Sequence, residues 1–260
     1  MKKKFLISRK IINPFFTVVT VVKNHKNLIS KTISSIKNQS FKNFEYVVID
    51  GNSNDGTLDI ILSNKKNINF LISENDKGIY YAMNKAIKIA KGKVIVFVNS
   101  GDILTNNALK IIHKQFIKKP KIDFVFGTVK RHYTTSKILK YGFDINKLKY
   151  NFDFATSHST GFYIKLSSLK KIGNFNTKYR CSADYDFYYR AIIKEKLIGN
   201  STRKGQLIGI MASGGYSSSI SFFEHLLEET KIRIDNGQNI FLIFLIFFNA
   251  IIKSLFKKIL

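Results

Sequence analysis

Cysteine is nearly absent from this sequence, and other common signals are missing altogether. The single cysteine, Cys181, has no second thiol in the chain with which to form a disulfide, which favours a reducing compartment. The sequence contains no zinc-finger spacing, no helix-turn-helix and no RNP aromatic pattern. A basic nucleic-acid-binding protein is therefore a weak alternative, and we expect no nucleic acid partner.

Long apolar runs are also missing. The segment Phe5–Ile7, which follows three lysines, is too short for the core of a signal peptide, and no small-residue cleavage site follows it. Near the C-terminus, the run Ile240–Phe248 extends through Asn249 to Ile252, which is less than the ~18–20 residues that cross a bilayer. These observations predict a cytoplasmic chain.

Acidic residues are few beside the basic ones. The 260 residues include 17 Asp and Glu against 43 Lys and Arg, a formal net charge of +26. One interpretation is attraction to a polyanion such as an anionic membrane. The other is that lysine is simply the favoured surface residue, since the basic residues come as scattered pairs and triplets rather than as one block.

What the sequence does contain is a regular alternation of strand and helix patterns. Phe16–Val22 is a continuous β-branched run, and Leu28–Ile36 has its apolar residues at helical spacing. The alternation continues with strands and helices at Phe44–Ile49, Leu58–Leu62, Ile68–Ile72, Ile79–Ala90 (closed by Gly92) and Val94–Val98. Further on, we expect strands at Phe124–Val129 and Gly161–Ile164, a helix at Ala183–Lys196, and a capping box at Ser221 and Glu224. This order predicts an α/β fold with a mostly parallel sheet and right-handed crossovers.

Polar residues follow each of the first four predicted strands. They are Lys23-Asn24, Asp50-Gly51-Asn52, the segment Glu74 to Gly78, and Asn99-Ser100-Gly101-Asp102. Ligands of open α/β sheets bind beyond the carboxyl ends of the strands. Ordinary turn chemistry is the alternative, and it explains any one of these strand ends more easily than all four.

Five stretches in order resemble one known family. They are TVVTVVKN (Thr17–Asn24), EYVVIDGNSNDGT (Glu45–Thr57), the segment Ser73–Asp102, HSTGFYIKL (His158–Leu166) and SADYDFYYR (Ser182–Arg190). Together they resemble the family-2 inverting glycosyltransferases of the GT-A fold, and more narrowly the bacterial surface-polysaccharide branch of colanic-acid and O-antigen type. The resemblance covers about residues 15–217.

The resemblance implies a domain organisation. It predicts a GT-A glycosyltransferase domain over residues 1–218, with a nucleotide-binding half at about 15–102 and an acceptor or catalytic half at about 103–218. The GT-A core is a mostly parallel central sheet flanked by helices. Residues 219–260 are expected to form a helical, membrane-associating extension.

The resemblance also implies a metal-bound nucleotide-sugar donor. The expected donor is a UDP-sugar whose pyrophosphate is bridged by Mg²⁺ or Mn²⁺, and Asp102 matches the last acid of a DxD-like motif that binds this ion. One carboxylate is enough, because Mg²⁺ keeps several waters and also binds substrate phosphates. Gly101 departs from the pattern, since a second acid often stands there. The alternative for Asp102 is an acid of the loop that precedes a helix near Asn106.

The catalytic base is the second implied role. Asp184 stands in the position of the family's "ED" motif, with Ala183 in place of the preceding Glu, and we expect it to deprotonate the acceptor hydroxyl. Asp186 is the competing candidate. Residues two apart on a helix point about 200° apart, so only one of these two acids should face the cleft.

Further contacts follow from the same resemblance. The expected nucleotide-sugar-binding residues are Val22, Asn24, Asp50, Asp76, Gly78, Asn84, Asn99, Ser100 and Asp102. Near the phosphates or the acceptor we expect His158, Gly214, Gly215 and Asp186. His158 could equally be a hydrogen-bonded structural histidine, and the two glycines could form an ordinary turn.

The C-terminal tail predicts contact with a membrane surface. Asn249, Lys253 and Lys257 recur every four residues, which makes a polar stripe on an otherwise apolar helix. We expect an interfacial helix, and the alternative is a core helix packed on the domain. A basic enzyme held peripherally on the anionic inner face of the cell membrane would suit a lipid-linked saccharide acceptor.

A competing hypothesis is a nucleotide-binding protein of the same fold that has lost catalysis. Its support is that Gly101 and Ala183 each replace an expected acid.

Overall fold

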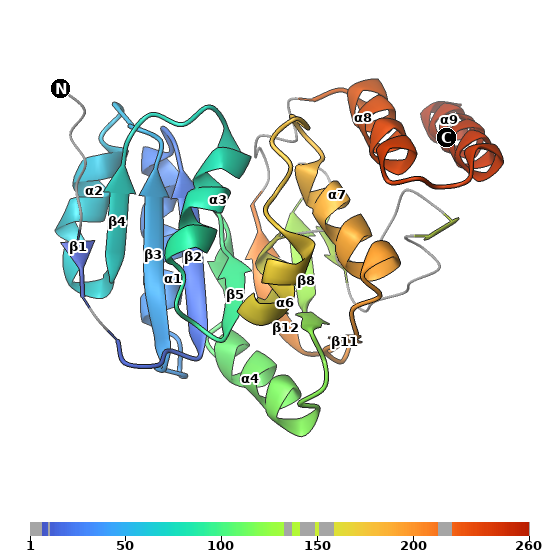
Figure 1. The fold of residues 1–260 in the computed structure, drawn as a ribbon. Coiled ribbons are helices and arrows are strands. Elements are labelled where there is room, and N and C mark those ends of the chain that lie inside the picture. The colour runs from blue at the N-terminus through green and yellow to red at the C-terminus, as the bar shows by residue number, and fades with distance from the viewer. Residues whose placement is uncertain are drawn as a thin grey trace.

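The predicted parallel strands form the centre of a large sheet in the computed structural model (Figure 1). The structure describes residues 7–9, 11–132, 137–140, 149–150, 159–212 and 220–259. Among them, eight strands form one sheet in the order β1-β4-β3-β2-β5-β10-β7-β11. The parallel centre comprises β4 (Phe70–Ser73), β3 (Phe44–Asp50), β2 (Phe16–Val22) and β5 (Val94–Phe97).

The rest of this sheet has mixed direction. β10 (Phe162–Lys165) runs antiparallel between β5 and β7 (Phe124–Phe126), and β11 (Gly199–Ser201) is parallel to β7. At the other edge, β1 (Ile7–Ser8) pairs antiparallel with β4. The expectation of a mostly parallel α/β sheet is confirmed.

Helices cover both faces of the sheet. Side chains alternate along β2, so Val19 and Val21 belong to the apolar core on one face of the sheet, to which α3 (Ile79–Ile89), α6 (Leu166–Ile172) and α7 (Ala183–Tyr189) also contribute. On the opposite face, Phe16, Val18 and Val22 belong to a second core, to which α1 (Lys26–Lys37), α2 (Thr57–Ser63) and α4 (Ala108–Lys118) contribute. Burial on both faces explains why the strand is apolar throughout. Short helical turns complete the layers: η1 (Lys65–Asn67), η2 (Ser159–Gly161) and the π-helical turn η3 (Arg190–Lys194), which continues α7.

A second, smaller sheet corrects one prediction. Its strands are β6 (Ile103–Leu104), β12 (Leu207–Met211), β8 (Thr128–His132) and β9 (Lys137–Lys140), in that order. The single strand expected over Phe124–Val129 is wrong, because β7 ends before Gly127 and β8 begins after it in the other sheet. A Cβ at Gly127 would lie 1.7 Å from Cδ1 of Ile208, so a larger residue at this crossing between sheets would displace the buried Ile208 side chain.

A second correction concerns the end of α3. The helix ends at Ile89, with Ala90 already in an extended conformation, so it is not closed by Gly92. Gly92 instead permits a close approach to β2, because a Cβ there would lie 2.4 Å from the backbone N of Thr17.

The C-terminal residues form two packed helices beside α7 (Figure 1). α8 (Phe222–Asp235) begins with the predicted capping box, in which Ser221 and Glu224 bond to each other's backbone N–H groups. α9 (Ile240–Ile259) follows and packs on α8. Within the described residues, no helix combines the length and apolarity needed to cross a membrane.

Candidate functional site

A cleft of about 1070 Å³ opens beyond the carboxyl ends of the central strands. This is where ligands bind in open α/β sheets. Of the predicted site residues, the structure brings the following into its lining: Val22, Asn24, Asp76, Gly78, Asn99, Ser100, Asp102 and Asp184.

Asp102 follows β5 and is held from three other segments. Its Oδ2 accepts a 2.6 Å hydrogen bond from the Thr160 hydroxyl, and its Oδ1 accepts one of 3.2 Å from the backbone N of Ala212. The Thr32 hydroxyl donates to the backbone carbonyl of Asp102 at 2.9 Å. The carboxylate is nearly fully buried, so its direction in the cleft is fixed.

The neighbouring Gly101 has a structural reason to be glycine. Its φ is +99°, a conformation that L side chains rarely adopt. An added Cβ would also lie 3.1 Å from Cβ of Ala212 and 3.3 Å from Cε1 of His25. The loop therefore leaves little room for a second acid beside Asp102.

Asn99 supplies a second oxygen to this part of the cleft. Its amide Nδ2 donates to the Ser159 hydroxyl at 3.2 Å, while its Oδ1 is buried without a partner in the part of the chain that the structure describes. Such an orphaned acceptor fits a hydroxyl donor or a hard cation. No cluster of three or more His, Cys, Asp or Glu suited to a metal occurs within the described ranges.

Asp184 lies in the first turn of α7 and is half-buried at the cleft. Its Oδ1 accepts a 2.9 Å bond from the backbone N of Tyr185 and a 3.2 Å bond from the Tyr80 hydroxyl. Burial, reinforced by the Asp184 charge, raises the pKa of Tyr80 well above its ordinary value. Tyr80 thus keeps its hydroxyl proton, which it shares between the Asp184 carboxylate and the Cys181 carbonyl, the latter 3.0 Å away.

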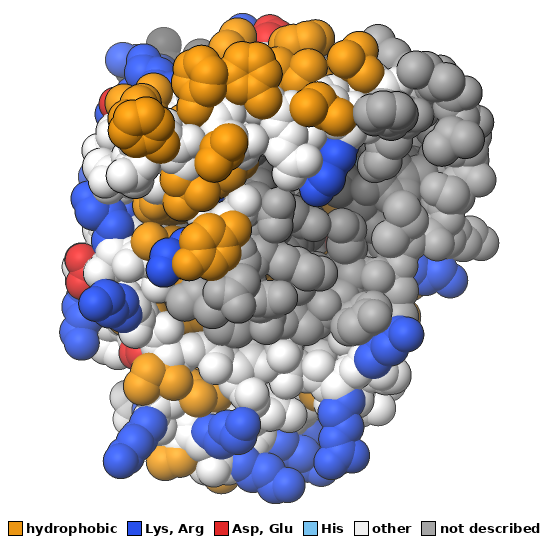
Figure 2. All heavy atoms as spheres, turned by 90° about the vertical axis from the view of Figure 1, so that its right-hand side faces the viewer, with side chains coloured by type: hydrophobic (Ala, Val, Ile, Leu, Met, Phe, Trp, Pro, Cys, Tyr) orange, Lys and Arg blue, Asp and Glu red, His pale blue; other side chains and the backbone are white. Residues whose placement is uncertain are grey.

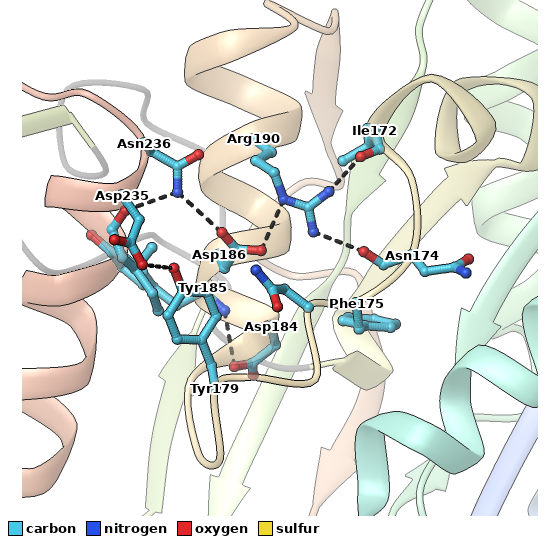
Figure 3. A network of polar contacts seen from close by, with 12 residues as sticks. Ile172, Asn174, Phe175, Tyr179, Asp184, Tyr185, Asp186, Arg190, Asp235 and Asn236 are labelled. Atoms are coloured by element: carbon cyan, nitrogen blue, oxygen red, sulfur yellow. Dashed lines mark hydrogen bonds and ion pairs between the residues drawn. The ribbon is translucent and has the colours of Figure 1, made fainter.

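Asp186 lies outside the described lining of the cleft. Figure 3 shows it directed toward Arg190 and Asn236, away from Asp184. Its Oδ2 accepts a 2.8 Å ion-paired bond from Nε of Arg190, and its Oδ1 accepts a 3.0 Å bond from the Asn236 amide. Arg190 also donates to the backbone carbonyls of Ile172 and Asn174, so Asp186 ties α7 to α8 and to the turn after α6.

Asp76 also lines the cleft and precedes α3 in the chain. Lys85 lies 2.6 Å from its Oδ1 and also pairs with Glu74. Burial raises the pKa of Asp76, and the Lys85 ammonium opposes that rise. Gly78 lies in the same loop.

The remaining predicted residues are placed elsewhere. Asp50 is fully buried and accepts bonds from Ser53 and from the Ser73 hydroxyl, which fixes the turn after β3. The Asn84 side chain makes two hydrogen bonds to the backbone of Phe175: its Nδ2 donates to the carbonyl and its Oδ1 accepts from the N–H, at 2.9 Å each. Their nucleotide contacts stay predictions. His158, Gly214 and Gly215 lie outside the described residues.

Comparison with known proteins settles the family. Residues 17–191 match the sequence model of Glycosyl transferase family 2. The chain belongs to this family. The resemblance read from the sequence is confirmed, and with it the expectation that the chain is a glycosyltransferase.

This family-2 chain has relatives over most of its length. It is 28% identical over 232 residues to a PGL/p-HBAD biosynthesis glycosyltransferase of Mycobacterium bovis, covering 85% of this chain and 87% of that one. It is 30% identical over 183 residues to the UDP-Glc:alpha-D-GlcNAc-diphosphoundecaprenol beta-1,3-glucosyltransferase WfgD of Escherichia coli, covering 61% and 72%.

Solved structures share its fold. Residues 1–349 of S. aureus TarS in complex with UDP superpose with a TM-score of 0.64 at 19% identity, over 84% of this chain and 64% of that one. The present chain spans only 39% of the longer TarS chain. The mannosyltransferase PcManGT from Pyrobaculum calidifontis, in complex with GDP-Man and Mn²⁺, gives 0.65 at 17% identity over 92% and 69%. At these identities the likeness shows the GT-A fold alone, as expected from the sequence.

The cleft of this family-2 chain also contains basic side chains that the sequence analysis did not single out. They are His25 and Arg180, which join Lys23 and Lys77 of the predicted strand ends, and His25 Nδ1 lies 3.1 Å from the Ser100 hydroxyl. In a chain with 43 Lys and Arg, no sequence signal separates these from ordinary surface charge. Their position suits a diphosphate.

Proposed function

We propose that this family-2 chain transfers a sugar, with inversion, from a nucleoside diphosphate sugar to an acceptor used in cell-surface polysaccharide synthesis. The observation that carries the proposal is the presence of Asp102 and Asp184 in one cleft beyond the strand ends. A UDP-linked donor and a lipid-linked saccharide acceptor are supported by the name of the relative WfgD, which specifies both.

In this proposal Asp102, with Asn99 beside it, would hold Mg²⁺ or Mn²⁺. Both side chains present oxygen atoms, which hard cations prefer, and a relative in fold, PcManGT, was solved with Mn²⁺. A bound ion would stabilise the charge that develops on the departing diphosphate. Lys23 and His25 add basic side chains to the same cleft.

Asp184 would be the general base. It would accept the proton of the acceptor hydroxyl as that oxygen attacks the anomeric carbon from the side opposite the diphosphate. Tyr80 and the backbone N of Tyr185 fix one carboxylate oxygen, which orients the group for this transfer. The bonds of Asp186 to Arg190 and Asn236 leave it unsuited to the same role.

We further propose that the chain docks peripherally on the anionic, cytoplasmic face of a membrane through α9. Figure 2 shows hydrophobic side chains gathered where α8 and α9 lie. On α9, Ile243 and Ile246 are buried, but a stripe with helical spacing is exposed: Phe241, Phe244, Leu245, Phe248, Ile252 and Leu255. Asn249 and Lys253 are exposed beside this stripe. An exposed apolar face flanked by lysine is typical of an interfacial helix.

The test combines binding and turnover. UDP affinity is measured by calorimetry with Mn²⁺ and with EDTA, and turnover as UDP release from UDP-glucose in the presence of α-D-GlcNAc-diphosphoundecaprenol. Asp184→Asn should keep the UDP affinity and lose turnover by about 10²–10⁴-fold, the contribution of a general base. Full turnover in Asp184→Asn would rule out its role as base. UDP binding without turnover of any UDP-sugar in the unaltered chain would favour the catalytically impaired alternative.

A further inference from the structure

The loop that leads into α7 is held by one carboxylate of α8. Glu228 Oε1 accepts a 2.6 Å bond from the backbone N of Arg180. Its Oε2 accepts bonds from the backbone N of Cys181 at 2.8 Å and of Ser182 at 2.6 Å. Ser182 is the N-cap of α7, and Asp184 lies two residues further on. Glu228 is therefore bonded to the residues that set where α7 begins.

An ionised carboxylate suits this position. Burial opposes the charge, but hydrogen bonds from the Cys181 thiol and from the backbone of residues 180–182 hold the pKa of Glu228 below its ordinary value. Hydrogen bonds to a charged acceptor are shorter and about twice as strong as neutral ones. Glutamine at this position would replace one carboxylate oxygen, an acceptor, by an NH₂ group, a donor. That donor would face the backbone N–H groups, which are also donors.

The same helix holds the chain on both sides of Asp184. Before it, the Tyr179 hydroxyl donates to Asp235 Oδ2 at 2.6 Å, and Lys178 pairs with the same carboxylate at 2.8 Å. After it, Asn236, which follows α8 directly, donates to Asp186 at 3.0 Å (Figure 3). α8 thus fixes the entry to α7 and the buried side of its first turn.

We propose that Glu228 is a positioning residue for Asp184: by holding residues 180–182, it directs the Asp184 carboxylate into the cleft. Among the described residues, Glu228 is not part of the cleft lining, so it acts through the loop and not on the substrate. The proposal rests on the proposed function, in which Asp184 is the base. A displacement of about 1 Å at a reacting group costs about 10²-fold in rate. Loss of this carboxylate should therefore lower kcat by about 10–100-fold.

The single cysteine of the chain is a built-in reporter of the loop. The Cys181 thiol lies 2.9 Å from Glu228 Oε2, and burial together with this carboxylate raises the pKa of the thiol to about 12. Because only the thiolate reacts, the unaltered protein should react slowly with Ellman's reagent. Glu228→Gln should accelerate the reaction several-fold. The matched control is Glu195→Gln, an exposed glutamate just after η3.

Turnover is measured on the same variants as UDP release from UDP-glucose, and UDP affinity by calorimetry. Support requires faster thiol labelling, a kcat lowered about 10–100-fold, and UDP affinity and donor KM within about twofold of the unaltered chain. A purely structural loss would instead lower UDP affinity together with kcat. Glu228→Asp, which keeps the charge but is shorter, should be intermediate and serves if the glutamine variant does not fold.

Two outcomes would overturn the proposal. Unchanged labelling in Glu228→Gln would mean that this carboxylate does not hold the loop. Faster labelling with full kcat would mean that the loop does not position Asp184. If the unaltered chain neither binds UDP nor releases it from any UDP-sugar, the proposed function itself fails and the positioning role fails with it. The labelling rates then still decide whether Glu228 holds residues 180–182.

Discussion

Gly101 offers a sharp test of why this site has a single acid. Gly101→Ala should lower the free energy of unfolding by about 1–3 kcal/mol, the cost of holding a non-glycine residue in a sparsely populated backbone region. The φ of +99° imposes that cost, and the 3.1 Å approach to Cβ of Ala212 adds crowding. At ~2–4 °C per kcal/mol for a chain of this size, the Tm should fall by roughly 2–12 °C.

The assay is thermal and urea unfolding of Gly101→Ala beside a matched glycine. Gly205 is the control, because an added Cβ there meets nothing within 4 Å and its φ is not in the left-handed region. Gly205→Ala should stay within about 1 kcal/mol of the unaltered chain. Equal stability of the two variants would refute the strain argument.

Gly101→Asp extends the test to the metal. If the loop has no room for a second acid, this variant should lose stability and gain no Mn²⁺-dependent affinity for UDP. A stable variant with tighter Mn²⁺-dependent binding would show that Gly101 reflects a lost ligand rather than a crowded loop.

Four further predictions follow from the contacts described. Asp102→Asn should remove most of the difference between UDP binding in Mn²⁺ and in EDTA, and an unchanged difference would exclude Asp102 as the metal ligand. Asp186→Asn should cost about 1–3 kcal/mol in urea unfolding, because Arg190 loses its charged partner, without changing UDP affinity. Phe244→Ser combined with Phe248→Ser should reduce co-sedimentation with anionic phospholipid vesicles, whereas retained binding would argue against α9 as the docking face. Because the folded pKa of Glu228 is below its ordinary value of 4.5, its contribution to stability is present above about pH 4.5 and lost as the pH falls further. Glu228→Gln should therefore lose less stability than the unaltered chain on acidification, and equal losses would contradict the low pKa.

Local sequence patterns were sufficient to predict the parallel half of the fold. β2 has the predicted bounds Phe16–Val22, because a strand buried on both faces leaves an unbroken apolar signal. The capping box at Ser221 was predictable for a similar reason, since all its atoms lie within four residues. Gly127 was not, because its role depends on Ile208, which is remote in the sequence.

The candidate site likewise has residues that the sequence predicts and residues that it does not. The acids at the strand ends were predictable, because a parallel sheet brings the carboxyl ends of its strands together. The spacing of Asp184 and Asp186 already implied that one of them faces away from the cleft. The contacts of Glu228 leave no sequence signal, because its partners lie 46 to 48 residues earlier in the chain. No pattern in the neighbouring sequence identifies a carboxylate whose hydrogen-bond partners lie in a distant loop.

The bonds between α8 and the entry to α7 bear on how the chain can be shortened. A protein that ends at residue 218, the expected limit of the transferase domain, would lack Glu228 and leave the backbone N–H groups of residues 180–182 without that acceptor. One that ends after Gln238 would keep α8, and it would keep the bond from the buried Arg233 to Gln238. It would lose only α9 and its exposed apolar stripe. The two C-terminal helices are therefore not one appendage: α8 bonds to the loop that lines the cleft, whereas α9 packs on α8.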